Sequence, residues 1–238
     1  MADLVLYELA GADDRLRFSP YCWKSRMALA HKGLTAQCVP WHFTNKEALR
    51  FSGQERVPVL IDDGKSIHDS WRIALHLETH YPKSPSLFGG ESAIALADFV
   101  NRWADTVLLP AITPIILYDI FLLLGPADQS YFRTSREARF GRRLEEIGAD
   151  STTLIANLRR TLEPLRQIIN GRPFLAGGQP AYADYSLFGM FMWARCVSET
   201  ELLDADDPLH TWREALLDIH GGIARHAFTV VHLKDSSS

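Results

Sequence analysis

A change in hydrophobic periodicity near residue 82 is the feature that most limits how this chain of 238 residues can fold. Before that point, short apolar runs of strand length alternate with helical runs. After it, nearly every apolar run has the spacing of an amphipathic helix. Residues 82–90, with the sequence PKSPSLFGG, have the composition of a linker. The pattern predicts a small α/β domain over 1–82, a linker over 83–91 and an all-helical domain over 92–238.

The first half is expected to run strand, helix, strand, irregular segment, strand, strand, helix. The first helix should begin at Ser19-Pro20 and end near His31, because Gly33 follows it at a favourable stop position. The second helix should run from Ser70 to about His80, before Pro82. The strands are expected over residues 4–7, 37–41, 57–61 and 65–68.

The second half is expected to be helical over residues 93–108, 136–147, 153–169 and 183–197. One apolar stretch, residues 107–124, is long enough to raise the question of a membrane span. It contains Pro110, Pro114 and Asp119, which a lone spanning helix carries at a cost in free energy. The sequence therefore favours a buried, kinked core helix and no membrane partner.

Charge and cysteine content exclude several classes of protein. The formal net charge is −4, so the chain lacks the basic footprint of a nucleic-acid-binding protein. Cys22, Cys38 and Cys196 are scattered without metal-binding spacing, which indicates a reducing compartment. The N-terminus has neither the basic nor the apolar region of a signal peptide. We therefore expect a cytoplasmic protein without a metal.

Ser19 and Pro20 open the first predicted helix after a predicted strand. Serine before proline is a common helix cap, and that structural role alone is a sufficient explanation. The position also suits chemistry, because the N–H groups and dipole at a helix N-terminus stabilise an anion, including a thiolate. Lowering a thiol pKa of about 8.5 by about two units corresponds to roughly 2.7 kcal/mol. A helix end with one serine hydroxyl is a plausible source of that stabilisation.

The same four residues have the spacing of a redox centre with sequence Cys-Pro-Tyr-Cys, in which Ser19 replaces the first cysteine. Without that partner, Cys22 cannot close an intramolecular dithiol cycle. Cys22 is therefore interpreted as a packed small residue and not as a reagent.

Two further dipeptides are candidates for ligand binding. Val57-Pro58 begins a predicted strand, and a cis bond there would leave the Val57 N–H and C=O free to pair with an extended peptide. Asp69-Ser70 precedes a predicted helix, where a capping role for Ser70 is the simpler interpretation. Together, the carboxylate of Asp69 suits an ammonium group, and Ser70 at a helix N-terminus suits a carboxylate.

Asp184 lies at the start of an apolar helix in the string Ala181-Tyr182-Ala183-Asp184. We expect it to satisfy unpaired N–H groups of that buried helix and assign it no catalytic role. Ala181 lacks the capping oxygen of Ser, Thr or Asn, whose loss costs about 1 kcal/mol. Asp184 would then act alone or with a water molecule.

The order and spacing of these features resemble those of cytosolic glutathione S-transferases over about residues 3–225. The strings that carry a closer likeness to bacterial β-etherase-like members are Ser19-Pro20-Tyr21, His31-Lys32-Gly33, Glu55-Arg56-Val57-Pro58-Val59, Asp69-Ser70-Trp71, Ser135-Arg136-Glu137 and Ala183-Asp184-Tyr185-Ser186. The resemblance implies a thioredoxin-like glutathione-binding domain, an all-helical domain with an electrophile pocket, and a homodimer. It also implies glutathione as co-substrate and a small apolar or aromatic electrophile.

The resemblance also implies roles for individual residues. Ser19 would donate a hydrogen bond to the glutathione sulfur as the catalytic residue. Glutathione would be bound by Gln54, Arg56, Val57, Pro58, Asp69 and Ser70, with Lys46 a further candidate for its glycyl carboxylate. The apolar wall of the electrophile pocket is expected from Trp103, Leu108, Ile112, Tyr118 and Phe121, for each of which plain core packing is the alternative.

The expected reaction is attack of the glutathione thiolate on the electrophile, with β-aryl ether cleavage as a possible outcome. The rate enhancement would come from a larger thiolate fraction, from the proximity of the two reactants and from their desolvation. Three alternatives stay open at this point. They are a general conjugating or peroxide-reducing transferase, a thiol–disulfide oxidoreductase, and a non-catalytic glutathione-binding scaffold with the same fold.

Overall fold

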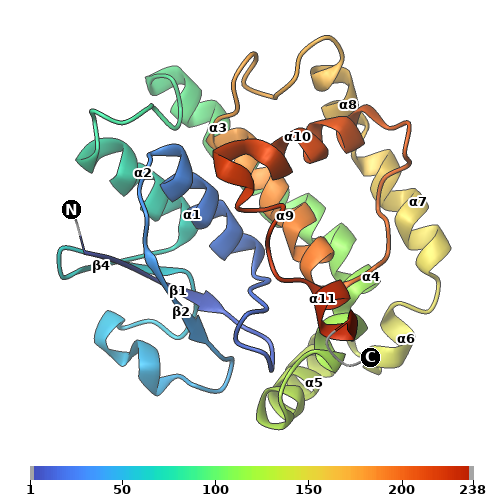
Figure 1. The fold of residues 1–238 in the computed structure, drawn as a ribbon. Helices are drawn as coiled ribbons and strands as arrows, with labels where there is room; N and C mark the ends of the chain where they lie inside the picture. Colours follow the sequence, from blue (N-terminus) through green and yellow to red (C-terminus); the bar gives the residue numbers. More distant parts are fainter. Residues whose placement is uncertain (1–2, 236–238) are drawn as a thin grey trace.

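The first half of the chain forms a four-stranded sheet with strand order β2-β1-β3-β4 (Figure 1). The computed structural model describes residues 3–235. β1 (Leu4–Leu9) pairs in parallel with β2 (Gln37–Trp41), and β3 (Val59–Asp62) is antiparallel to both β1 and β4 (Lys65–His68). Helix α1 (Pro20–His31) connects β1 to β2, the 3-10 segment η1 (Glu47–Ser52) follows β2, and α2 (Ser70–His80) follows β4. This is a thioredoxin-like domain, as the sequence predicted.

Local signals in the sequence explain most of these boundaries. α1 has Ser19 as its N-cap and Pro20 in its first turn, and Gly33 follows it with φ of 70°. Only glycine adopts that left-handed conformation without a steric cost, so the helix stops there. β3 begins two residues later than predicted, because Pro58 has no N–H to donate to the ladder.

The second half is helical throughout. Its elements are α3 (Glu91–Trp103), the π-helical segment η2 (Ala104–Leu108), α4 (Leu109–Leu122), α5 (Pro126–Phe140), α6 (Leu144–Ile147), α7 (Ser151–Thr161), α8 (Glu163–Ile169), α9 (Tyr182–Val197), α10 (Pro208–Gly222) and α11 (Val230–Asp235). α3, η2 and α4 follow one another without a break, so they form one long helical segment.

Two of the predicted helices are each divided in the structure. The predicted helix over 136–147 is wrong, because α5 ends at Gly141, which has φ of 65°, and α6 is a separate turn. The predicted helix over 153–169 is also wrong, because α7 and α8 are separate and Pro164 lies in the first turn of α8. Proline is tolerated there because its missing N–H has no partner in a helix's first turn.

α9 forms the centre of the molecule and joins its two halves. Fourteen of its sixteen residues are buried, and it packs against α1, α3 and α4 (Figure 1). Gly189 makes the close approach to α1 possible, since a Cβ atom there would lie 2.5 Å from the Pro20 carbonyl oxygen. The interface between the domains is therefore a continuous hydrophobic core.

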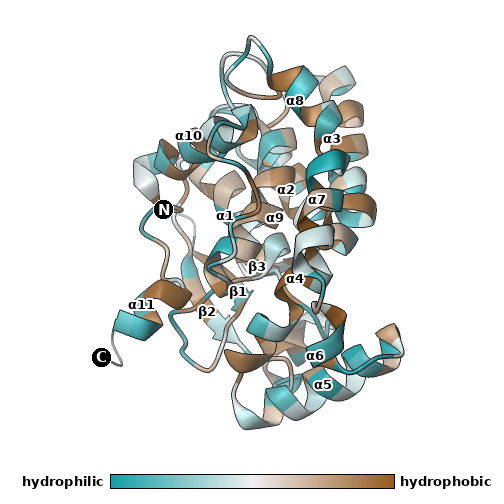
Figure 2. Cartoon of the chain, turned by 90° about the vertical axis from the view of Figure 1, so that its right-hand side faces the viewer, coloured by the Kyte–Doolittle hydropathy of each residue, from teal (hydrophilic) through white to brown (hydrophobic). Residues whose placement is uncertain are grey.

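One face of the apolar segment that raised the question of a membrane span belongs to this core. By length and composition alone, Glu91–Leu122 is the one helical segment in the described part of the chain that would cross a membrane. Core helices of soluble proteins pass the same test, and α4 packs against α6, α7 and α9. Its hydrophobic residues are prominent in Figure 2, and Ile112, Ile116 and Ile120 are buried among those helices.

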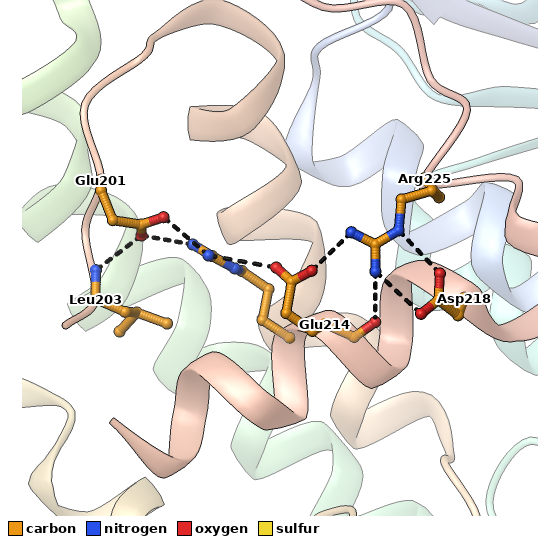
Figure 3. Close-up of polar contacts among 6 residues, drawn as sticks. Glu201, Leu203, Glu214, Asp218 and Arg225 are labelled. Atoms are coloured by element: carbon orange, nitrogen blue, oxygen red, sulfur yellow. Dashed lines mark hydrogen bonds and ion pairs between the residues drawn. The ribbon is translucent and has the colours of Figure 1, made fainter. Parts of the chain in front are cut away.

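A chain of ion pairs fixes α10 and the turn that follows it (Figure 3). Arg225 binds both oxygens of Asp218, at 2.9 and 3.0 Å, and one oxygen of Glu214 at 2.6 Å. Arg213 binds both oxygens of Glu201, at 2.7 and 2.9 Å. These contacts tie the segment after α10 and the loop after α9 to the same helix.

Candidate functional site

A cavity of about 360 Å³ lies where the N-terminus of α1, the loop before β3, α4 and α5 meet. Ser19, Arg56 and Val57 all line it, although they are far apart in the sequence. Other lining residues are Leu9, Phe18, Pro20, Tyr21, Trp41, Phe43, Leu109, Thr113, Leu117, Ile120, Tyr131, Phe132, Ser135, Arg136, Arg139, Phe140 and Trp193. The size and the mainly apolar, aromatic lining are those of a small-molecule site.

Ser19 has the geometry of a hydrogen-bond donor to the cavity. It is the N-cap of α1 and 4% exposed, and its Oγ accepts a hydrogen bond from the Cys22 N–H at 3.4 Å. A hydroxyl has one proton and two lone pairs. The Cys22 N–H uses one lone pair and the hydroxyl also contacts the Cys22 thiol, so the hydroxyl donates to an acceptor in the cavity by rotating away from that thiol.

The N-terminus of α1 adds a positive electrostatic potential at the same place. Its first turn carries no acidic residue, so the dipole is not neutralised there. Tyr21 also lines the cavity, and burial, followed by the charges of Asp105 and Asp69, raises its pKa to about 12. At neutral pH the Tyr21 phenol is therefore protonated and is a second possible donor, which the sequence alone did not single out.

Cys22 is a packed residue, as predicted. Its side chain is 2% exposed, and burial raises the pKa of its thiol to about 12. The thiolate, which is the reactive form, is therefore scarce at neutral pH. This geometry disfavours the thiol–disulfide oxidoreductase alternative.

The segment before β3 contributes two residues to the cavity lining. The Val57-Pro58 peptide bond is cis, and Val57 and Arg56 line the cavity. Pro58 is buried, and Gln54 lies outside the lining, with its N–H bonded to Ser52 Oγ at 3.2 Å. Of the residues implied by resemblance, Ser19, Arg56 and Val57 are thus brought together.

Asp69, and not Ser70, is the N-cap of α2. Its Oδ1 accepts hydrogen bonds from the N–H groups of Trp71 at 3.0 Å and Arg72 at 3.1 Å. Ser70 is the first residue of the helix and is buried, and its carbonyl accepts a hydrogen bond from the Tyr182 hydroxyl at 2.9 Å. Neither Asp69 nor Ser70 lines the cavity, but the charge of Asp69 is close enough to raise the pKa of Tyr21.

The residues expected to form the apolar wall lie elsewhere. Trp103, Leu108, Ile112, Tyr118 and Phe121 are absent from the cavity lining, and α4 contributes Leu109, Thr113, Leu117 and Ile120 instead. Leu108 and Ile112 are fully buried in the core. Leu109, Thr113, Leu117 and Ile120 recur every three or four residues and so share one face of α4, whereas Ile112, Tyr118 and Phe121 lie beside that face.

α5 supplies a part of the site that the sequence analysis missed. Tyr131, Phe132, Ser135, Arg136 and Arg139 all line the cavity from this helix. Residues 126–135 received no assignment from the sequence, and the residues after them were predicted only as part of a helix over 136–147. Their spacing of three to four residues was the available signal, because it places them on one helical face.

Comparison with known proteins gives two family models that together span most of the chain. The model of the glutathione S-transferase N-terminal domain matches residues 15–85, and that of the C-terminal domain matches residues 95–218. The glutathione S-transferase-like protein ustS of Aspergillus flavus is 28% identical over 144 residues, 53% of this chain. That match covers 49% of the relative, so it spans about half of the relative's length.

Solved structures share the whole architecture. Glutathione transferase GSTFuA3 of Phanerochaete chrysosporium is 26% identical, with a TM-score of 0.80 over 90% of this chain and 96% of its own. Glutathione S-transferase CsGST63524 of Ceriporiopsis subvermispora, solved in complex with glutathione, is 22% identical, with a TM-score of 0.78 over 92% of this chain and 96% of its own.

Proposed function

This chain belongs to the glutathione S-transferase family, and on that premise we propose that it transfers glutathione to an aromatic electrophile with Ser19 as the catalytic residue. The observation that carries the proposal is the position of the Ser19 hydroxyl. It lies at the N-terminus of α1, on the wall of the cavity, with its acceptor side occupied by the Cys22 N–H. The hydroxyl proton reaches an anion in the cavity by rotation about the Cβ–Oγ bond.

The chemical role of Ser19 is to stabilise the glutathione thiolate. A hydrogen bond to a charged group contributes about 1.5–3 kcal/mol, and the helix N-terminus adds a favourable potential. Together these lower the pKa of the glutathione thiol and raise the thiolate fraction at neutral pH. Glutathione is itself the nucleophile, so no covalent enzyme intermediate is needed.

Glutathione, as co-substrate, would bind along the N-terminal domain. The Val57 backbone would pair with the cysteinyl residue, and Arg56 would contact glutathione nearby. Asp69 and Ser70 would hold the γ-glutamyl end, because Oδ2 of Asp69 is not used in capping α2. Lys46 is a candidate for the glycyl carboxylate, since its Nζ lies 5.6 Å from the ring of the cavity residue Tyr131.

β-Aryl ether cleavage is the specific reaction that we propose. The thiolate would attack the carbon that bears the aryloxy group, so that a C–S bond forms and the C–O bond breaks. The phenolate leaves and takes a proton from solvent. The support is the mainly apolar and aromatic cavity next to Ser19, which suits an aryl group.

We also propose a homodimer in the cytoplasm. Leu96 and Phe99, one turn apart on α3, are 68% and 67% exposed, and Phe51 of η1 is 55% exposed. Leu96 and Phe99 lie at neighbouring positions, and adjacent large apolar side chains left in water are typical of an interface. Light scattering after gel filtration would give twice the mass of the chain, and a mass of one chain would contradict the proposal.

The first test replaces Ser19 with alanine. We expect Ser19→Ala to lower kcat/KM about ten- to a hundredfold and to raise the pKa of bound glutathione, measured from the ultraviolet absorbance of the thiolate. Ser25→Ala is the matched control, because Ser25 lies on the same helix, outside the cavity, with its Oγ donating to the Tyr21 carbonyl. An unchanged thiol pKa in Ser19→Ala would remove Ser19 from the mechanism.

The second test compares substrates after calorimetric measurement of glutathione binding. Turnover of a β-aryl ether would support the specific reaction. Turnover of only an aryl halide or a peroxide would indicate a general transferase. Binding without any turnover would indicate a scaffold, and absence of glutathione binding would contradict the proposed function as a whole.

A further inference from the structure

The cavity carries an unusual charge for a protein that is acidic overall. Three of its lining residues are arginines, Arg56, Arg136 and Arg139, and none of the described residues that line it is an aspartate or a glutamate. The whole chain has a formal net charge of −4. Positive charge is therefore concentrated at this site, although the molecule as a whole carries a net negative charge.

These arginines lack carboxylate partners. Within residues 3–235, Arg136 donates to Ser135 Oγ at 2.9 Å, and Arg139 contacts the ring of Phe140, but neither they nor Arg56 forms an ion pair. Arg133 on the same helix provides the contrast. It lies outside the cavity lining and pairs with Glu137 and Glu145, each at 2.8 Å. The arginines of α5 are thus paired away from the cavity and unpaired where they face it.

Arg136 is held in place by aromatic rings. Its guanidinium carbon lies 4.4 Å from the ring centroid of Phe132 and 5.3 Å from that of Phe43. The side chain is half-buried, and this burial lowers its pKa; the interaction with Tyr131 opposes the shift, and the charges of Arg139 and Arg56 add to it. A bound anion would relieve this repulsion, and a planar guanidinium suits the two oxygens of a carboxylate.

We propose that Arg136 and Arg139 bind a carboxylate on the aromatic electrophile, so that the substrates of this enzyme are aromatic acids. The inference rests on the proposed function, in which Arg56 and Lys46 are assigned to glutathione and leave the two arginines of α5 unused. The apolar side chains of α4, such as Leu117 and Ile120, line the same cavity and accept the ring. The carboxylate then fixes which carbon faces the thiolate near Ser19.

The test uses a chlorodinitrobenzoate and its methyl ester, which share the ring and the leaving group. In both, the glutathione thiolate attacks the carbon that bears chlorine, the C–S bond forms, the C–Cl bond breaks and chloride leaves. The thiol proton passes to solvent. Each enzymatic kcat/KM is divided by the uncatalysed rate constant, because the ester withdraws electrons more strongly than the carboxylate.

The wild type should prefer the acid over the ester by this normalised measure. Arg139→Gln should lower kcat/KM for the acid about ten- to a hundredfold, with the ester rate and the Kd for glutathione unchanged. Arg136→Gln should act in the same way if it folds. Arg142→Gln is the matched control, because Arg142 lies just beyond α5, outside the cavity lining, and donates to the Glu146 carbonyl.

Two results would overturn the inference. One is equal normalised rates for acid and ester in the wild type. The other is a weaker Kd for glutathione in Arg139→Gln, which would assign this arginine to the glutathione site.

Failure of the proposed function would look different, because the protein would neither bind glutathione nor turn over the ester. In that case, binding of dinitrobenzoate and of its methyl ester, which have no leaving group, decides the inference. Fluorescence of Trp41 and Trp193, which line the cavity, reports this binding. Tighter binding of the acid that is lost in Arg139→Gln supports the carboxylate site, and equal binding overturns it.

Discussion

Asp184 shows how one buried carboxylate joins three segments of the chain. The residue is fully buried, and its two oxygens accept hydrogen bonds from the Leu175 N–H at 2.8 Å, the Ala181 N–H at 3.1 Å and Trp212 Nε1 at 2.9 Å. A longer contact of 3.4 Å comes from the Ala176 N–H. Asp184 therefore joins the segment before α9, the start of α9 and α10; its role is structural, as expected, but its donors lie before the helix and on α10 and not in the first turn of α9.

We predict that Asp184→Asn lowers the free energy of unfolding by about 3 kcal/mol, because the amide presents an NH₂ donor to groups that are themselves donors. Urea unfolding followed by circular dichroism measures the change. Trp212→Phe is the informative companion, since it removes one donor, keeps an aromatic ring and should cost less. A loss below about 1 kcal/mol in Asp184→Asn would show that the site relaxes around the amide.

At the scale of elements, Asp128 fastens α5 to the loop after β2. Its carboxylate, which is 4% exposed, accepts from the Phe43 N–H at 2.9 Å, the Thr44 N–H at 2.9 Å and Thr44 Oγ1 at 2.7 Å. The two halves of the chain thereby meet next to the cavity, since Phe43 and several residues of α5 line it.

Removing this contact should make the residues around the cavity more mobile, while the protein as a whole stays folded. We predict that Asp128→Ala lowers the free energy of unfolding by about 2 kcal/mol and speeds amide exchange at Phe43 and Thr44. The KM for the electrophile should rise, because α5 no longer has a fixed place. Thr44→Val is the graded control, since it removes only the hydroxyl bond. Equal exchange at Phe43 in the wild type and Asp128→Ala would contradict the prediction.

The elements also show which parts of the fold and site a sequence can reveal. α1 and α2 were predictable because Pro20, Gly33 and Pro82 act locally on the backbone. Ser19 followed from the same logic, since a helix N-terminus is both a structural feature and an anion site. The cavity face of α4 was not predictable, because apolar residues surround most of this helix and its sequence does not indicate which face meets the cavity. Arg136 and Arg139 could not be assigned to the site from the sequence, because only the fold brings α5 against the loop after β2.

At the scale of the whole molecule, three side chains link α1, α9 and α10 across the domain interface. His31 Nδ1 lies 2.7 Å from the Tyr185 hydroxyl, which lies 2.9 Å from His220 Nε2. His31 Nε2 lies 3.0 Å from the Ser86 carbonyl and must donate to it. In the neutral state His31 Nδ1 therefore accepts from Tyr185, and Tyr185 accepts from His220.

This order of donors makes the domain interface sensitive to acid. Burial, followed by the charge of His31, lowers the pKa of His220 to about 4, and burial also lowers the pKa of His31. An unfolded histidine has a pKa of about 6.5, so below that pH the unfolded chain binds protons that the folded chain does not. The contribution of His220 to stability is therefore complete above about pH 6.5 and falls as the pH drops through about 4.

We predict that the free energy of unfolding falls between pH 7 and pH 4.5, and that His220→Asn makes this fall shallower. Asparagine suits the backbone there, where φ is 53°, so the variant tests the ionisation and not a strained turn. Urea titrations at a series of pH values measure both slopes. His80→Gln, which changes an exposed histidine on α2, should keep the wild-type slope. If His220→Asn also keeps that slope, other groups carry the acid sensitivity and the linkage of His31, Tyr185 and His220 does not determine how the two domains stay together.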